Sequence, residues 1–445
     1  MIELESPVER AILVGAQIKG PHGRANGNGS SGPAAPTRSQ VMDEHLSELE
    51  QLADTAGAVV VGELTQQLDR PNPATYLGKG KIDELARAIS DNRATLTIFD
   101  DELTPAQGKN IEDATGQRVI DRAELILDIF ATRARSSEAR MQVELAQLQY
   151  MLPRLTRMWT HLEKFRGGIG VRGPGETQLE TDRRLINSRI KLLRQRLEDV
   201  QKSRGVQRVS RKGEFKASLV GYTNSGKSSI LRAMSGSAVF VEDRLFATLD
   251  PLTREVQLSE NTSILLTDTV GFIRKLPHHL VASFRATLEE VVEADLLLHV
   301  IDVSHPAWDE QRTIVDGVLS ELGVGDKPRL HVFNKIDRLD EEDRLPIETA
   351  IRDQIPHSVF VSAVTPGALD PLQRALLSAV RTRRPVTEVR VPVTNGKLIA
   401  EIHREAEVLE QRHEGEELIM RARVDAALAG RLKSAGAKLS VRASS

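Results

Sequence analysis

The stretch FKASLVGYTNSGKS (residues 215–228) decides the fold class of this chain. Residues 215–220 have the apolar character of a buried strand, and the next eight follow the pattern G-x-x-x-x-G-K-S with a helical segment behind them. In a strand–loop–helix of this kind, backbone N–H groups surround a phosphate and the helix N-terminus adds its positive dipole end. The candidate phosphate-binding residues are therefore Gly221, Tyr222, Thr223, Asn224, Ser225, Gly226, Lys227, Ser228 and Ser229.

Two side chains of this loop have predicted roles of their own. We expect the Lys227 ammonium to reach the β- and γ-phosphate oxygens of a nucleotide. We expect the Ser228 hydroxyl to bind Mg²⁺. A full eight-residue match between a strand and a helix makes a chance glycine loop a poor explanation.

A second motif follows the apolar strand expected at 263–266 and consists of Asp268, Thr269, Val270 and Gly271. Its aspartate is suited to hold Mg²⁺ through water, and the Gly271 N–H is suited to sense the γ-phosphate. The Mg²⁺ shell also needs a threonine from the loop between the first two motifs. Thr248, preceded by the candidate nucleotide-binding residues Phe246 and Ala247, is the preferred choice, and Thr253 is the alternative. We therefore predict that Lys227, Thr248 and Gly271 take part in catalysis and that Ser228 and Thr248 bind the metal.

Two more motifs indicate which base is bound. Asn334, Lys335, Ile336 and Asp337 follow the strand expected at 330–333, and Ser362 and Ala363 follow the one at 359–361. The Asp337 carboxylate can accept hydrogen bonds from the guanine N1–H and 2-amino group, a donor pair that adenine lacks. Four motifs in this order, each at the C-terminal end of a strand, predict a GTP site at the edge where α/β sheets bind ligands.

One absence shapes the expected kinetics. Small GTPases often place a glutamine after the second motif to orient the attacking water, whereas this chain has Phe272. A phenylalanine side chain cannot hydrogen-bond water. We therefore expect slow intrinsic hydrolysis and stimulation of at least about tenfold by a partner surface.

The composition excludes several classes of protein. The 445 residues contain no cysteine, which excludes disulfide scaffolds, thiolate zinc sites and cysteine nucleophiles. No apolar run approaches the ~20 residues that span a bilayer, and the N-terminus is acidic rather than a basic signal region. We expect a cytoplasmic protein without stable membrane insertion.

Charge is distributed unevenly along the chain. Residues 131–216 hold 20 Lys and Arg against 9 Asp and Glu, while the remainder holds 40 against 54. This basic block indicates either a surface that meets RNA phosphates or a long solvated helix pair, and charge alone does not choose between them. Because aromatic residues make up only 3%, phosphate contact is favoured over base stacking.

The basic block has the pattern of a helical hairpin. Long helices are expected at 122–151 and 177–202, with the glycine-rich stretch HLEKFRGGIGVRGPGE (161–176) between them. This tip is either a plain connector or a finger whose small residues let the backbone approach RNA. Its five glycines favour the finger.

The predicted fold class is α/β multidomain. Strands at 8–18, 58–64, 94–100 and 118–120 alternate with helices, which indicates parallel βαβ units. We expect an N-terminal α/β domain (1–130, with a flexible loop at 21–40), a basic helical hairpin with a Gly-rich tip (131–205), and a GTPase domain with helices on both faces of a parallel sheet (206–384). A small α+β domain (385–445) should follow, in the order strand, helix, strand, helix.

Motifs outside the nucleotide site resemble the HflX family, ribosome-associated P-loop GTPases related to translation factors. The similar stretches are 78–85, 119–130, 142–148, 167–177, 182–184, 246–251 and 268–274. The resemblance implies a GTPase that uses Mg²⁺, binds the large (50S) ribosomal subunit and its ribosomal RNA, and splits or rescues stalled or idle 70S ribosomes under stress. The hairpin tip would then reach toward the peptidyl transferase region. We expect a monomer. Ser225, Ser229 and Leu252 depart from the usual family residues and leave the phosphate and Mg²⁺ ligands in place.

Two other functions are weighed against this one. An ATP-dependent RNA remodeler is disfavoured because Asp337 specifies guanine. A ribosome-assembly GTPase would need a KH-type domain, and no GXXG loop in a suitable context follows Val386.

Overall fold

The computed structural model describes residues 8–18, 38–155, 174–208, 214–236, 244–260, 262–276, 288–384 and 386–441. The chain divides into two compact units. The described parts of Met1–Asp199, Arg244–Phe246 and Lys275–Arg285 form the first, and those of Val200–Asp243, Ala247–Arg274 and Ala286–Ser445 form the second. No described helix is long and apolar enough to cross a membrane.

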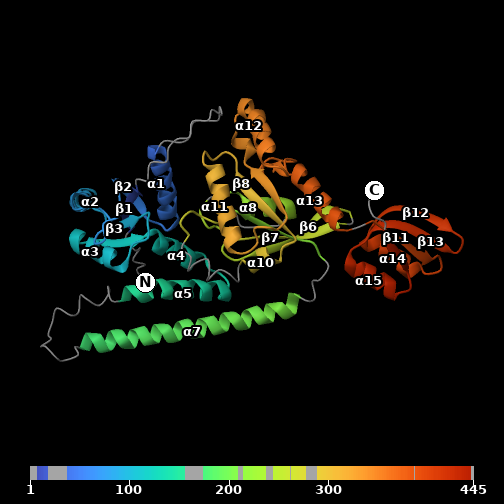
Figure 1. Ribbon diagram of the computed structural model, residues 1–445, viewed down its shortest axis with the longest axis horizontal. Helices are drawn as coiled ribbons and strands as arrows, with labels where there is room; N and C mark the ends of the chain where they lie inside the picture. Colours follow the sequence, from blue (N-terminus) through green and yellow to red (C-terminus); the bar gives the residue numbers. More distant parts are fainter. Residues whose placement is uncertain are drawn as a thin grey trace, which may run out of the picture. The chain divides into compact units, whose positions relative to one another are not determined.

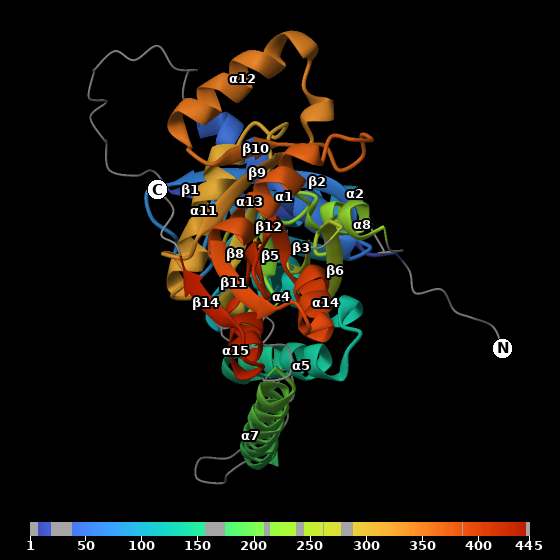
Figure 2. The same cartoon turned by 90° about the vertical axis from the view of Figure 1, so that its right-hand side faces the viewer.

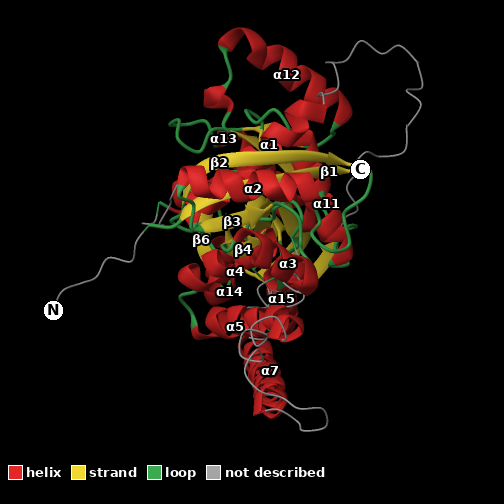
Figure 3. Cartoon of the chain, turned by 90° about the vertical axis from the view of Figure 1, so that its left-hand side faces the viewer, coloured by secondary structure: helices red, strands yellow, loops and turns green. Residues whose placement is uncertain are grey.

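The first unit contains a four-stranded sheet in the order β2-β1-β3-β4, and every neighbouring pair is parallel. Parallel strands need crossover helices, and the chain supplies one between each pair. The elements in chain order are β1 (Arg10–Ile18), α1 (Arg38–Thr55), β2 (Val59–Leu68), α2 (Lys79–Asn92), β3 (Leu96–Phe99), α3 (Pro105–Thr115), β4 (Arg118–Asp121) and α4 (Arg122–Arg133) (Figure 3). Apolar side chains of α2 and α3, such as Leu85 and Ile111, share one core with Ile12 and Val119 of the strands.

Two further helices pack against each other, and the second of them belongs to this unit up to Asp199. They are α5 (Ser137–Met151), followed by a 3₁₀ turn (Leu152–Arg154), and α7 (Pro174–Arg208) (Figure 1). Ile190 and Leu193 of α7 are buried against Leu145 of α5. The predicted hairpin therefore has two packed helices, while most of its glycine-rich tip lies outside the described residues.

The prediction of one helix over 122–151 is wrong. The chain forms α4 and α5 with a break at Ala134, whose backbone is extended (φ −64°, ψ 112°). Ser136 then caps α5, because its hydroxyl accepts a hydrogen bond from the Ala139 N–H at 3.0 Å. A serine ahead of an apolar pattern is a start signal that the helical periodicity of the stretch concealed.

The second unit contains a six-stranded sheet in the order β10-β9-β8-β5-β7-β6, parallel except for the edge pair β6–β7. Its elements are β5 (Lys216–Gly221), α8 (Lys227–Ser235), β6 (Leu252–Ser259), β7 (Thr262–Asp268), α10 (Glu289–Glu293), β8 (Leu296–Asp302), α11 (Trp308–Glu321), β9 (Arg329–Asn334), α12 (Glu341–Gln354), β10 (Ser358–Phe360) and α13 (Asp370–Arg383). Ile230 of α8 and Leu376 of α13 share one core with Leu219 of β5. Ile351 of α12 packs with Phe333 of β9 in a separate core. Helices thus cover both faces of the sheet, as predicted.

The second unit ends in a smaller antiparallel sheet in the order β12-β13-β11-β14. Its elements are β11 (Val386–Pro392), α14 (Gly396–Glu405), β12 (Glu407–Glu414), β13 (Glu417–Arg423), α15 (Ala426–Ser434) and β14 (Lys438–Val441) (Figure 2). Ile402 of α14 and Leu432 of α15 join the same core as Val389 and Met420, so both helices cover one face. Strands β12 and β14 were not predicted from the sequence, because β12 is mostly polar and β14 has only four residues.

Candidate nucleotide-binding site

The phosphate-binding loop lies between β5 and α8, as the motif predicts. Gly226 has a φ of 95°, and a Cβ added to it would lie 2.1 Å from the Asn334 amide nitrogen. A side chain at position 226 is therefore excluded by both the backbone conformation and the neighbouring residue. The same asparagine donates from Nδ2 to the Ser225 carbonyl at 2.9 Å, so the first and third motifs are joined directly.

Lys227 lies in the interior of this loop. Its ammonium donates to the carbonyl oxygens of Tyr222 at 2.8 Å and Gly221 at 3.2 Å, and the residue is 6% exposed. Burial lowers the pKa of Lys227 to about 8, although the negative charge of Asp268 opposes this effect. A buried cation, shielded from water, attracts the negative charge of a phosphate chain strongly.

Three oxygen-bearing side chains meet beside the loop. The Ser228 hydroxyl donates to Asp268 Oδ2 at 2.6 Å and lies 2.8 Å from Thr248 Oγ1. Burial raises the pKa of Asp268, although the nearby Lys227 charge and the Ser228 hydroxyl lower it. Within the described residues, Asp268 Oδ1 is buried and has no hydrogen bond. Hard oxygen ligands beside a buried carboxylate suit Mg²⁺, so the residues present fit this metal.

The geometry also separates the two threonine candidates. Thr253 lies in β6, and its hydroxyl is 2.9 Å from that of Thr267 on the neighbouring strand. Thr248 is the one that reaches Ser228. Phe246, predicted to bind nucleotide, instead packs its ring edge-on against Phe130 within the first unit, with centroids 4.7 Å apart.

The third and fourth motifs lie next to each other at the ends of β9 and β10. The Ala363 N–H donates to Asn334 Oδ1 at 3.2 Å. The Ser362 hydroxyl accepts from the N–H groups of Val364 and Thr365, which fixes the turn of this loop. Asp337 lies exposed on the short 3₁₀ helix Ile336–Arg338.

The side chains of several other predicted residues are buried and stabilise the fold around the site. Thr269 is fully buried and donates from its hydroxyl to the Leu219 carbonyl at 2.6 Å, which ties the end of β7 to β5. Val270 and Ile336 are also buried. Within the part of the chain that the structure describes, the side chains of Ala247 and Ser229 make no hydrogen bond or ion pair.

Three contacts of the site were not predicted from the sequence. Asp302, at the end of β8, pairs with Lys335 at 2.7 Å. The Tyr222 hydroxyl accepts the backbone N–H of Arg274 at 2.9 Å. The link from Asn334 to Ser225 was also unforeseen. An acidic residue at the end of an apolar strand was the available signal for Asp302, whereas the other two contacts carry no local signature.

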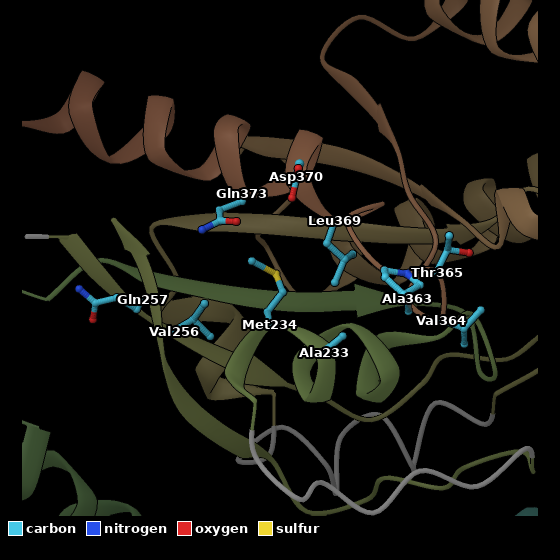
Figure 4. A pocket seen from close by; sticks show the side chains of 12 residues that line it. Ala233, Met234, Val256, Gln257, Ala363, Val364, Thr365, Leu369, Asp370 and Gln373 are labelled. Carbon is cyan, nitrogen blue, oxygen red and sulfur yellow. The ribbon is translucent and has the colours of Figure 1, made fainter. Parts of the chain in front are cut away.

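A pocket of about 330 Å³ adjoins the fourth motif (Figure 4). It is lined by Met234 of α8, Val256 of β6, Gln373 of α13 and the loop that contains Ala363. Neither Gly221–Ser229 nor Asn334–Asp337 contributes to its lining. Of the predicted nucleotide-binding residues, the pocket shares only Ala363.

The fold and the four assembled motifs define a P-loop GTPase. Three family models match the chain: GTP-binding GTPase N-terminal at residues 43–131, GTP-binding GTPase Middle Region at 133–211, and 50S ribosome-binding GTPase at 216–335. Among curated relatives, the GTPase HflX of Caldanaerobacter subterraneus is 43% identical over 98% of this chain and 95% of its own length. The GTPase HflX of Escherichia coli is 45% identical over 80% of this chain and 83% of its own length. The chain belongs to the HflX family of GTPases.

Two of the similar solved structures are complexes with GDP. A complex of SsGBP with GDP covers 84% of this chain and 99% of its own, at 25% identity and a TM-score of 0.45. A GTP-binding protein from Sulfolobus solfataricus, also with GDP, has the same coverage at 25% identity and a TM-score of 0.42.

Proposed function

We propose that this GTPase binds the large ribosomal subunit through ribosomal RNA and splits or rescues stalled or idle ribosomes under stress. It acts in the cytoplasm as a monomer. The family model named for 50S binding and the relatives named HflX support the class of partner. The observation on which the proposal rests is a row of basic side chains along α7.

Three basic side chains of α7 are exposed, whereas its apolar residues pack against α5. Ile190 and Leu193 face α5, whereas Arg184, Lys191 and Arg194 are exposed. Within the described residues, none of these three cations has an ion pair or hydrogen bond, whereas Arg189 of the same helix pairs with Glu144 at 2.6 Å. Unpaired cations spread over three turns of one helix suit the phosphates of RNA better than they suit a protein partner.

At the nucleotide site, we propose that Gly221–Ser229 bind the phosphates, that Asn334–Asp337 with Ser362 and Ala363 bind guanine, and that Asp268–Gly271 meet the γ-phosphate. Lys227, Thr248 and the Gly271 N–H contact the transferring group. Ser228 and Thr248 would hold Mg²⁺, which neutralises developing phosphate charge when bound. We also propose that the chain consists of the four domains predicted from its sequence, at residues 1–130, 131–205, 206–384 and 385–445.

The residue after the second motif supports dependence on a partner. The Phe272 side chain is 1% exposed and has no group that can orient water. Either a partner surface supplies the group that orients the attacking water, or binding of the partner rearranges the backbone around Phe272. We therefore expect the subunit to increase GTP hydrolysis at least about tenfold, a barrier change of about 1.4 kcal/mol.

The test is phosphate release from GTP and from ATP, each with and without purified large ribosomal subunits. The expected result is slow GTP turnover that the subunit accelerates and negligible ATP turnover. The variant Arg184→Gln/Lys191→Gln/Arg194→Gln should lose most of the stimulation and keep its basal rate. The wild-type stimulation should also fall steeply with salt.

A control variant with the same charge change elsewhere is Arg374→Gln/Lys397→Gln/Lys433→Gln, all at exposed positions. It should retain the stimulation. GTP turnover indifferent to the subunit would contradict the proposal. Equal turnover of ATP would favour the RNA remodeler, and stimulation by subunit precursors alone would favour an assembly role.

A further inference from the structure

The phosphate-binding loop and the segment after the second motif are joined by backbone hydrogen bonds. The Thr223 N–H donates to the Phe272 carbonyl at 2.7 Å, and the Phe272 N–H donates to the Gly221 carbonyl at 3.1 Å. Tyr222 and Phe272 thus form an isolated parallel bridge, outside the named strands. Both segments belong to the second unit.

A side chain adds a third link. The Tyr222 hydroxyl, on the second residue of the phosphate-binding loop, accepts the Arg274 N–H at 2.9 Å. Tyr222 is 5% exposed and Arg274 is 9% exposed, so water has little access to replace this bond. Phosphate binding by the loop uses backbone N–H groups, so it does not require any particular side chain at position 222. The nucleotide therefore does not explain why a tyrosine stands there.

The bridged segment carries the residue that should sense the γ-phosphate. A Cβ added to Gly271 would lie 2.7 Å from Thr223 Cα and 3.1 Å from Lys227 Nζ. Gly271 is therefore held directly against the loop and against the lysine that should reach the same phosphate. Because the adjacent Phe272 side chain offers no hydrogen bond, backbone placement is what sets the direction of the Gly271 N–H.

We propose that Tyr222 is a positioning residue for GTP hydrolysis, whose hydroxyl holds the Gly271–Arg274 segment in register with the phosphate-binding loop. Removing the hydroxyl deletes this acceptor of the Arg274 N–H, so the Gly271–Arg274 segment is held less firmly against the loop. The Gly271 N–H then meets the γ-phosphate in poorer geometry. GDP has no γ-phosphate, so its binding does not depend on this register. The inference rests on the GTPase activity of the family and not on the ribosomal partner.

The test is Tyr222→Phe, which keeps the ring and removes only the hydroxyl. In single-turnover assays without ribosomes, we expect the hydrolysis rate to fall at least about fivefold, roughly 1 kcal/mol of barrier. Affinity for a non-hydrolysable GTP analogue should fall, while affinity for GDP stays within about twofold. Amide hydrogen exchange should become faster in Gly271–Arg274, and the thermal midpoint of the GDP-bound protein checks that the variant is folded.

The matched control is Tyr150→Phe. The Tyr150 hydroxyl is also buried and donates to Asp121 Oδ1 at 2.9 Å, but it belongs to the first unit. This variant should leave the hydrolysis rate and the ratio of GTP-analogue to GDP affinity unchanged. An unchanged rate in Tyr222→Phe would overturn the proposal, and so would equal losses of GDP and GTP-analogue affinity, which indicate general support of the loop. Failure of ribosome stimulation leaves this test unaffected.

Discussion

At the scale of single residues, we propose that Asp337 carries the choice of base. It lies exposed on a 3₁₀ helix whose preceding residue, Lys335, is held by Asp302, and Asn334 fixes the start of the same motif against the phosphate-binding loop. The loop geometry is therefore set by neighbours of Asp337 and not by Asp337 itself. Its carboxylate can be altered without disturbing the framework.

We predict that Asp337→Asn weakens GTP binding at least about 100-fold, or about 2.7 kcal/mol, because two hydrogen bonds to a charged acceptor are lost. Xanthosine triphosphate, which has a carbonyl where guanine has its 2-amino group, should bind the variant better than GTP does. Competition of both nucleotides against fluorescent GDP measures this. Asp340→Asn, which changes a nearby aspartate outside the motif, is the control. An unchanged preference for GTP would place base recognition elsewhere.

The residues of the four motifs could be predicted because each motif is local in sequence and its chemistry requires particular side chains. The contacts between the motifs could not be predicted. Tyr222 and Arg274 are 52 positions apart, and Asn334 and Ser225 are 109 apart. Such pairs are set by the strand order of the sheet, and a single sequence carries no sign of them. The preference for Thr248 over Thr253 stays a prediction, and the register of β6 with β7 explains why the Thr253 hydroxyl lies beside Thr267 instead.

At the scale of elements, the ends of β3 and β4 are joined by a buried ionic cluster. Arg122, the first residue of α4, is 1% exposed and donates to Asp100 Oδ1 at 2.8 Å and to Glu48. Lys275 donates to the same Asp100 at 2.7 Å and to Asp101 at 2.5 Å, all within the first unit. Asp100 is therefore a buried carboxylate with two cationic partners of very different exposure.

We predict that Arg122→Ala destabilises the first unit by about 3–5 kcal/mol, because it leaves a buried carboxylate with a poorer partner and opens a cavity. Lys275→Ala should cost much less, because Arg122 still neutralises Asp100. Amide exchange of β3 and β4 peptides reports the two losses separately from the second unit. Equal effects of the two substitutions would contradict this ranking.

Element boundaries show where the sequence misled. The break between α4 and α5 depends on a serine cap, which the helical pattern of 122–151 outweighed. Strand β12 is almost entirely exposed and polar, so it lacks the alternation by which strands are recognised. It forms because β13 offers it a partner, and that is a tertiary cause. By contrast, β1, β3, β4 and β5 are largely buried apolar strands and were predicted near their observed positions. Strands β6 and β8 were not predicted.

At the scale of the whole molecule, acid sensitivity should be concentrated in the second unit. His299 of β8 and His331 of β9 lie side by side, with ring centroids 5.6 Å apart. Within the described residues, neither ring nitrogen of His331 has a hydrogen bond. Burial lowers the pKa of His331 to about 4 and also lowers the pKa of His299, although Asp316 opposes the shift at both. Arg312 and Arg329 face the same cluster and lower both values further.

We predict that the second unit loses stability as the pH falls from about 6.5 toward 4, by up to about 1.4 kcal/mol per pH unit for each histidine. Stability falls with falling pH because the histidines bind protons in the unfolded chain at a higher pH than in the folded protein. Their contribution to the free energy of unfolding is therefore complete above the unfolded pKa. Asp316, whose pKa is lowered, acts in the same direction at still lower pH.

The measurement is urea unfolding at pH 4.5–7.5, followed by Trp308 fluorescence in a Trp159→Phe background, since the chain has two tryptophans. Trp308 packs against Phe333 and reports on this unit. His331→Phe should flatten the pH dependence, whereas the exposed His357→Gln should not. A slope unaffected by His331→Phe would assign the acid response to other groups.

The C-terminal sheet has one property that concerns how such a protein can be built. Thr387, near the start of β11, pairs with Val441 at the end of β14, so the two ends of this domain emerge side by side. A segment whose two ends are adjacent can be inserted within a loop of another domain. It can also be circularly permuted, because a short linker joins its ends without crossing its core. It contacts α13 and the residue after it through ion pairs of Arg381 with Glu407 and Arg384 with Asp425, and through hydrogen bonds from Arg423 to backbone carbonyls.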